Sequence, residues 1–175
     1  MPYLIIYYEV SLSMKDYVLI MAPAIILAAL FTVFYGRSYD KFGFKKSISG
    51  SLILLLLGYA VLYFFRATIP VFVGSLFMMC GYLSGSAVFG AMLRDRTPQN
   101  KAGMFQGLRI VGQVLIPGII GPYIGAAVLK NAEKIVNSDG TTSFVPNKNI
   151  FLAAAFVALL LSVIFFMKED KKKNA

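Results

Sequence analysis

The amino-acid sequence predicts an all-α membrane protein with five transmembrane helices. Of its 175 residues, 58% are hydrophobic and 14% are charged, whereas a soluble domain has about 45–50% and about 25%. Apolar runs of 18 or more residues recur along the chain, and each is long enough to cross the hydrocarbon core of a bilayer. The basic residues gather in alternate segments between these runs. A soluble protein with a large apolar core is the alternative, but it does not explain the repeated long runs.

The predicted spans form one bundle over residues 16–167. They cover residues 16–35, 47–65, 70–93, 105–129 and 149–167. Ser13 and Asp16 have the spacing of a capping box, which indicates that the first span begins here. Pro23 lies inside that span and is expected to kink it. Pro70 occupies the first turn of the third span, where a missing N–H has no cost.

The two ends of the chain lie outside this bundle. Residues 2–8 are apolar, but a helix of that length covers only about a third of the hydrocarbon core. They lack the basic region and the cleavage site of a signal peptide. We therefore interpret residues 1–10 as the stub of a truncated helix, and residues 168–175 as a solvated basic cytoplasmic tail.

Positive charge divides the connecting segments into two sets. One set holds twelve bases: Arg37, Lys41, Lys45, Lys46, Arg94, Arg96, Lys101, Arg109, Lys168, Lys171, Lys172 and Lys173. The other holds five: Lys15, Arg66, Lys130, Lys134 and Lys148. Because bases accumulate on the cytoplasmic side, we expect the N-terminus outside and the C-terminus in the cytoplasm, in the plasma membrane. Topology thus explains the net charge of +9, and no nucleic-acid partner is expected, since that needs a contiguous basic face.

One connecting segment outside the membrane is long. The β-prone runs Ile135–Val136 and Thr141–Val145 flank the turn-forming residues Asn137–Gly140. This pattern predicts a small β-hairpin.

The residue inventory argues against an enzyme, a metal site or a bound cofactor. The chain has no histidine and one cysteine, Cys80, which excludes a disulfide framework, a Cys/His zinc site and histidine-based catalysis. No carboxylate lies at the middle of a span. The acids are Glu9, Asp16, Asp40, Asp95, Glu133, Asp139, Glu169 and Asp170.

The polar segment between the first two spans carries a recognisable motif. In "YGRSYDKFGFKKS", residues 35–47, the pattern G-x-x-x-D-[RK]-x-G-x-[RK] resembles a cytoplasmic loop motif of the major facilitator superfamily. The matching residues are Gly36, Asp40, Lys41, Gly43 and Lys45. The resemblance implies a conformational gate, in which the loop steadies one state across the interface between two halves of a transporter. Phe44 stands where the family usually has a base, so the implied charge network is thinner. A solvated turn that only carries topology charges is the alternative.

A second stretch narrows the resemblance. Residues 93–122, "LRDRTPQNKAGMFQGLRIVGQVLIPGIIGP", are similar to the loop between the tenth and eleventh helices, and to the eleventh helix, of the glycoside–pentoside–hexuronide:cation symporter group. The chain would then be the C-terminal half of a secondary active transporter, a partial six-helix bundle. Such a protein moves a sugar or related small polar solute by alternating access. The implied partners are the missing N-terminal half, the bilayer and the solute, with Na⁺ or H⁺ as coupling cation in the full-length protein. A stand-alone membrane subunit with a structural or regulatory role, or a nonfunctional truncated product, are the alternatives.

The fourth span combines a polar stripe with a row of glycines. At 100° per residue, Gln106, Arg109 and Gln113 share one face, and polar groups at membrane depth usually face a cavity or another helix. We take these three as candidate substrate-path residues. An interhelical hydrogen bond is the alternative for Gln113, and snorkelling to the headgroups is the alternative for Arg109. The neighbouring glycines are Gly103, Gly107, Gly118, Gly121 and Gly125.

Two further glycine patterns have structural interpretations. Pro117, Gly118, Gly121 and Pro122 predict a kink or an unwound segment. In the third span, Gly74, Gly81 and Gly85 share a face with Met78, which predicts close helix packing rather than a site.

Overall fold

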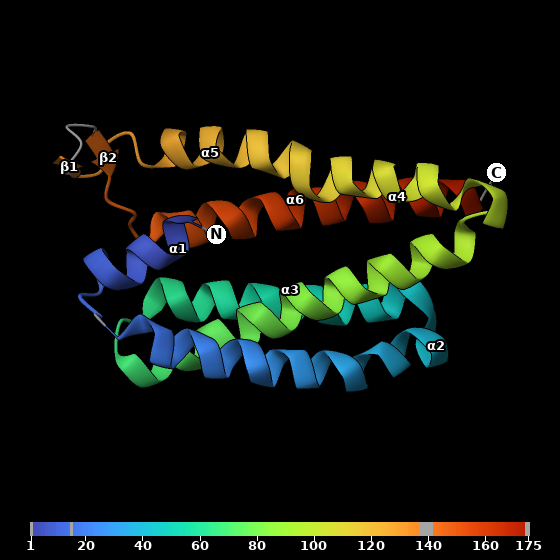
Figure 1. Ribbon diagram of the computed structural model, residues 1–175, viewed down its shortest axis with the longest axis horizontal. Coiled ribbons are helices and arrows are strands. Elements are labelled where there is room, and N and C mark those ends of the chain that lie inside the picture. The colour runs from blue at the N-terminus through green and yellow to red at the C-terminus, as the bar shows by residue number, and fades with distance from the viewer. Residues whose placement is uncertain (1, 15, 137–141, 174–175) are drawn as a thin grey trace.

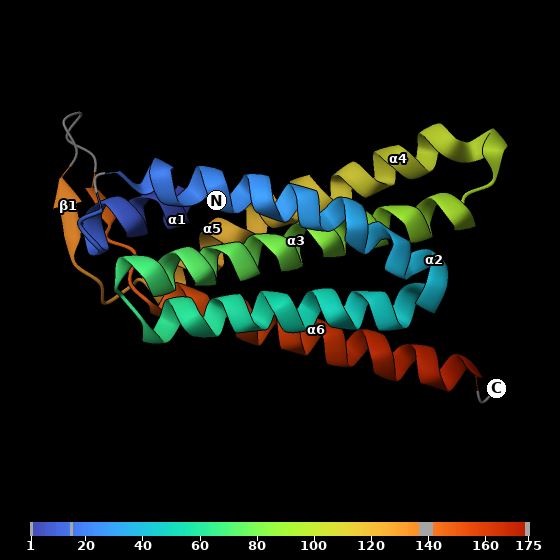
Figure 2. The ribbon, with the colours of Figure 1, turned by 90° about the horizontal axis from the view of Figure 1, so that it is seen from below.

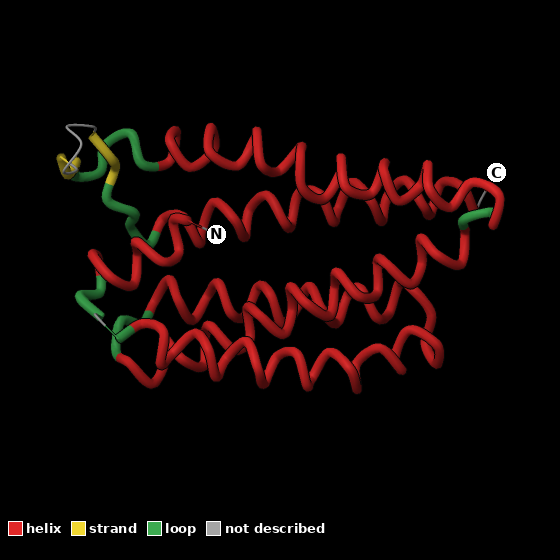
Figure 3. Tube along the Cα trace, viewed as in Figure 1, coloured by secondary structure: helices red, strands yellow, loops and turns green. Residues whose placement is uncertain are grey.

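A computed structural model describes residues 2–14, 16–136 and 142–173 (Figure 1). Its helices are α1 (Pro2–Ile6), α2 (Tyr17–Phe64), α3 (Thr68–Arg96), α4 (Ala102–Ile110), α5 (Ile116–Val128) and α6 (Asn149–Lys173). Two π-helical turns, η1 (Tyr7–Ser11) and η3 (Val111–Leu115), and a 3₁₀ turn, η2 (Gln99–Lys101), join them. The helices run roughly along one axis, and the strands lie at one end (Figure 3).

Helix α2 consists of two arms that run in opposite directions (Figures 1 and 2). Its helical geometry breaks at Gly43, where φ is 75° and ψ is 177°, a combination that residues with a side chain rarely adopt. The Tyr35 hydroxyl donates to the Ser47 carbonyl across this turn at 2.7 Å. The arms correspond to the predicted spans 16–35 and 47–65. The backbone at Pro23 keeps helical dihedral angles.

Within the described residues, three helical segments are long and apolar enough to cross a membrane. They are α2, α3, and the 27 residues of α4, η3 and α5, which we call the α4–α5 rod. The fold is therefore that of an all-α membrane protein. The count of five spans treats the arms of α2 as two and includes α6, and it stays a prediction.

The second arm of α2 packs closely against α3. A methyl group built on Gly58 would lie 2.4 Å from the Met78 backbone nitrogen, and one built on Gly81 would lie 2.4 Å from the Leu55 nitrogen. Buried serines accompany this contact, and the hydroxyls of Ser51 and Ser84 donate to carbonyls of their own helices. Small side chains thus let two backbones approach, as expected where lipid gives no hydrophobic drive for association.

The N-terminal segment packs into the core. Leu4, Tyr7 and Tyr8 are buried, the Tyr8 hydroxyl lies 2.6 Å from the Ser75 hydroxyl of α3, and the Tyr7 ring meets Phe151 of α6 edge-on at 5.1 Å. This short segment therefore contacts two long helices that are far apart in the sequence.

The connections are placed alternately at the two ends of the molecule. The α2 turn, the link between α3 and α4, and the last residues of α6 lie at one end, and the other connections lie at the opposite end (Figure 1). This arrangement is the one that the charge division requires. The strands β1 (Lys134–Val136) and β2 (Thr142–Phe144) pair antiparallel, with Ile135 opposite Ser143. The predicted hairpin is confirmed, and its turn lies outside the described residues.

The predicted capping box is wrong. Helix α2 begins at Tyr17 with Asp16 as its N-cap, and no side-chain hydrogen bond caps this end. Ser13 adopts a φ of 53°, so the chain turns before the helix instead of entering it at Ser13.

Candidate functional site

Two cavities are lined by candidate residues, and the larger one lies between four helical segments. It has a volume of about 620 Å³ and is bounded by the second arm of α2, by α3, by η3 with the start of α5, and by α6. Most of its wall is apolar or aromatic. The polar side chains in the wall are those of Ser51, Tyr82, Ser86, Gln113 and Ser162. An apolar cavity with a few convergent polar groups is the usual form of a small-molecule site.

Gln113 is held by Arg109. The Arg109 Nε–H donates to Gln113 Oε1 at 2.9 Å. Because an arginine only donates, the Gln113 oxygen must face it, and the amide NH₂ remains available as a donor for other groups. Gln113 lines the cavity, so it offers N–H donors to a ligand that carries acceptor oxygens. The polar stripe predicted from the sequence thus includes one directly bonded pair.

Gln106 lines a different, smaller cavity of about 340 Å³ between the end of α3 and the start of α4. The guanidinium group of Arg109 packs against Gly90, one of the residues that line this cavity, since a methyl group built on Gly90 would be 3.1 Å from Nη2 and 3.3 Å from Nη1. The three candidate residues therefore do not form one site. Gln113 lines one cavity, Gln106 lines another, and Arg109 contacts one lining residue of each, Gln113 and Gly90.

The α4–α5 rod departs from α-helical geometry about one turn before Pro117, where the proline and glycine pattern predicted a kink or an unwound segment. Pro117 and Pro122 lie within α5, which is helical together with Gly118 and Gly121. The irregular segment is η3, in which the Ile116 N–H bonds to the Val111 carbonyl, five residues back. Pro117 has no N–H, and its ring crowds the carbonyl four residues earlier, that of Gln113. The wide turn places the Gln113 backbone away from that clash, and such turns frequently occur at functional sites.

No residue of the α4–α5 rod is buried, within the described part of the chain. A methyl group built on Gly103, Gly107, Gly118 or Gly121 would meet no atom of another described segment within 4 Å, whereas one on Gly125 would clash with the Tyr3 ring. In α3 the outcome differs, because Gly74 and Gly81 are in tight contact with α2. The glycines of the third span therefore pack as predicted, and most of those in the fourth are uncovered.

The residues of the predicted gate loop have unequal structural roles. Gly43 makes the turn of α2, while Gly36 lies in a helix with open space beside it. Asp40 is exposed, and no hydrogen bond or ion pair joins it to another residue that the structure describes. Lys41 lies 5.3 Å from the centroid of the Phe42 ring. Lys45 lies in the second arm of α2, directly after Phe44, and its side chain or backbone interacts with other residues.

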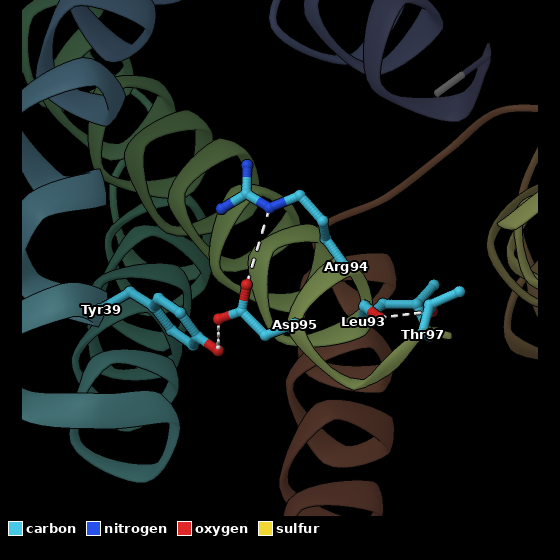
Figure 4. A network of polar contacts seen from close by, with 5 residues as sticks. All are labelled: Tyr39, Leu93, Arg94, Asp95 and Thr97. Atoms are coloured by element: carbon cyan, nitrogen blue, oxygen red, sulfur yellow. Dashed lines mark hydrogen bonds and ion pairs between the residues drawn. The ribbon is translucent and has the colours of Figure 1, made fainter. Parts of the chain in front are cut away.

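Another acid, Asp95, links the gate loop to α3 (Figure 4). The Tyr39 hydroxyl donates to Asp95 Oδ2 at 2.7 Å, and Arg94 Nε lies 3.6 Å from Oδ1. This bond to the carboxylate raises the pKa of Tyr39, because the phenolate would face a negative charge. Nearby, the Thr97 hydroxyl donates to the Leu93 carbonyl and closes the last turn of α3. Sequence reasoning missed the Tyr39–Asp95 contact, for which the only signal was an acid among bases in "RDR".

The long apolar helices, one of them without a buried residue, define an integral membrane protein. The whole chain, residues 1–175, matches the family model described as Major Facilitator Superfamily, and the chain belongs to this superfamily. No curated protein and no solved structure matches the chain.

Proposed function

We propose that this chain is the C-terminal half of a secondary active transporter that moves a sugar or a related small polar solute together with a cation. The observation that carries the proposal is the α4–α5 rod. It buries none of its residues, yet it contributes Gln113 to the wall of the larger cavity. A polar side chain that an uncovered helix contributes to a cavity wall favours a pathway completed by another group of helices.

In this proposal the larger cavity receives the solute from the side of the rod. Gln113 donates to a solute oxygen, with its amide fixed by Arg109. The aromatic rings of Phe44 and Phe89 in the same wall offer apolar faces for stacking on a sugar ring. Among the residues whose side chains the structure describes, none that lines this cavity is a carboxylate, which suits a transporter whose cation-binding residues lie in the partner half.

The gate loop acts in conformational switching within the same proposal. Asp40 is exposed and has no bonded partner among the described residues, which suits a carboxylate that meets its partner across the interface between halves. In a full-length transporter, Asp40→Asn is then expected to change the transport rate more than the amount of folded protein.

Solute binding tests this function directly. The chain in lipid nanodiscs would be titrated with a panel of mono- and disaccharides, with saturation-transfer NMR to detect weak contacts. We expect a signal for at least one sugar, and its loss in Gln113→Leu. The matched control is Gln106→Leu, which removes the same group from the other cavity. Equal signals in wild type and Gln113→Leu, or none for any sugar, would contradict the proposed site.

Membrane topology tests the orientation. In a Cys80→Ser background, single cysteines at Lys41 and Lys172 are expected to resist reagents that cannot cross the membrane, because both positions are proposed to be cytoplasmic. External labelling of either position would refute the orientation. Saturable solute uptake by liposomes that contain only this chain would refute its assignment as one half of a transporter.

A further inference from the structure

The smaller cavity has the composition of an anion-binding site. Its walls come from the last turns of α3 and the first turns of α4, and they include Arg94, Thr97 and Gln106 beside the apolar Leu93 and Phe105. None of the described residues that line it is acidic. Between residues 90 and 109 the sequence holds four bases (Arg94, Arg96, Lys101 and Arg109) and one acid.

The single acid of this region is already engaged. One oxygen of Asp95 accepts from Tyr39, and the other faces Arg94 Nε. The Arg94 side chain is 78% exposed, and Arg109 uses only Nε for Gln113 while its Nη groups lie beside Gly90 in the cavity wall. Guanidinium groups offer several N–H donors in a planar fork that matches the oxygens of a phosphate.

The depth of this cavity corresponds to lipid headgroups. The α4–α5 rod is 27 residues long, which gives about 40 Å of helix against about 30 Å of hydrocarbon, so about 5 Å extends beyond each side. Gln106 lies four residues after the first residue of α4, about 6 Å along the helix. The cavity is therefore at the boundary between hydrocarbon and headgroups. Met104 and Leu108 on the same helix are exposed and provide apolar surface for acyl chains.

We propose that this cavity binds the phosphate group of an anionic phospholipid. Arg94 and Arg109 contact the phosphate oxygens, and Gln106 bonds to the glycerol or ester oxygens. Inorganic phosphate has the same chemistry, but the headgroup depth and the apolar side chains beside the cavity favour a lipid. The inference is independent of the proposed solute and of the assignment to one half of a transporter.

Native mass spectrometry of the purified chain in a neutral detergent tests this site. It would be titrated separately with dioctanoyl phosphatidylglycerol, dioctanoyl phosphatidylcholine and inorganic phosphate. We expect about tenfold tighter binding of phosphatidylglycerol than of phosphatidylcholine, and a loss of about fivefold in each of Arg94→Gln and Arg109→Gln, since one base near a membrane surface contributes about 1 kcal/mol. Gly90→Val, whose side chain would crowd the Arg109 guanidinium without changing charge, should weaken binding as well.

The matched control is Arg37→Gln, which removes a base of the gate loop that does not line the cavity. Its phosphatidylglycerol affinity should stay within about twofold of wild type. Retained affinity in both Arg94→Gln and Arg109→Gln, or an equal loss in Arg37→Gln, would overturn the site. Equal affinity for phosphatidylcholine would overturn the anionic specificity. Displacement of phosphatidylglycerol by an equal concentration of inorganic phosphate would assign the cavity to a soluble anion instead of a lipid.

Discussion

The α2–α3 pair and the α4–α5 rod use the same residue types with opposite results. Both contain glycines at helical spacing. In α2 and α3, Gly58 and Gly81 lie against the backbone of the facing helix, while Gly118 and Gly121 of the rod face open space. In the most apolar 18-residue stretch of α3, half of the residues are buried. In the corresponding stretch of the α4–α5 rod, none is buried. A row of glycines therefore marks a helix face that another helix can approach closely. Whether that face is packed depends on the presence of a partner helix.

The largest expected effect is at the contact between α2 and α3. Gly81→Val would place Cβ 2.4 Å from the Leu55 nitrogen and 2.7 Å from the Ser51 carbonyl oxygen. Because backbone atoms must shift, we expect a loss of about 3 kcal/mol in the free energy of unfolding. The matched variant Gly121→Val, in open space, should change it by about 1 kcal/mol or less. Denaturant titration in mixed micelles, followed by circular dichroism, measures both, and equal losses would abolish the contrast between the two regions.

The turn of α2 gives a second matched pair. Gly43→Ala forces a side chain into backbone angles that are nearly exclusive to glycine, and should cost about 2 kcal/mol. Gly36→Ala, within the helix and without neighbours, should be neutral or stabilise by up to about 1 kcal/mol. The same titration compares them. A Gly43→Ala protein as stable as Gly36→Ala would mean that the two arms of α2 do not depend on this turn.

A buried hydroxyl gives a smaller effect. Tyr8→Phe removes the hydrogen bond to Ser75 and should lower the free energy of unfolding by about 1 kcal/mol. The control Tyr123→Phe alters a side chain on the rod that is 75% exposed, and it should have no measurable effect. An equal loss in Tyr123→Phe would show that the rod is more enclosed than it is in this structure.

The smallest effect concerns the two acids near the gate loop. Asp95→Asn should lower the pKa of Tyr39 toward its ordinary value of about 10, because the carboxylate that raises it is gone. Asp40→Asn should leave that pKa unchanged and should barely alter stability. Carbon NMR of labelled tyrosine rings follows the titration. In wild type, the Tyr39–Asp95 bond is complete below the ordinary tyrosine pKa and is lost as the pH rises through the higher folded value. Equal shifts in both variants would refute the specific link.

Much of the fold follows from the sequence because apolar runs and loop charges are local signals. They predicted the helices, the hairpin and the alternating connections. Long-range contacts had no such signal. The division of Gln106, Arg109 and Gln113 between two cavities depends on where α3 and α6 lie, and the wide turn at η3 alters the helical phase that a regular wheel assumes. Tyr39 and Asp95 are 56 residues apart, so their contact required the folded α2 turn.

The position of Arg109 implies a thermodynamic linkage. One side chain bonds to Gln113 in the wall of the larger cavity and lies beside Gly90 in the wall of the smaller one. If a headgroup on its Nη atoms changes the affinity for a solute by some factor, the solute must change the affinity for that headgroup by the same factor. The lipid composition of the membrane would then act as an effector of solute binding, through a single guanidinium group and without movement of a helix.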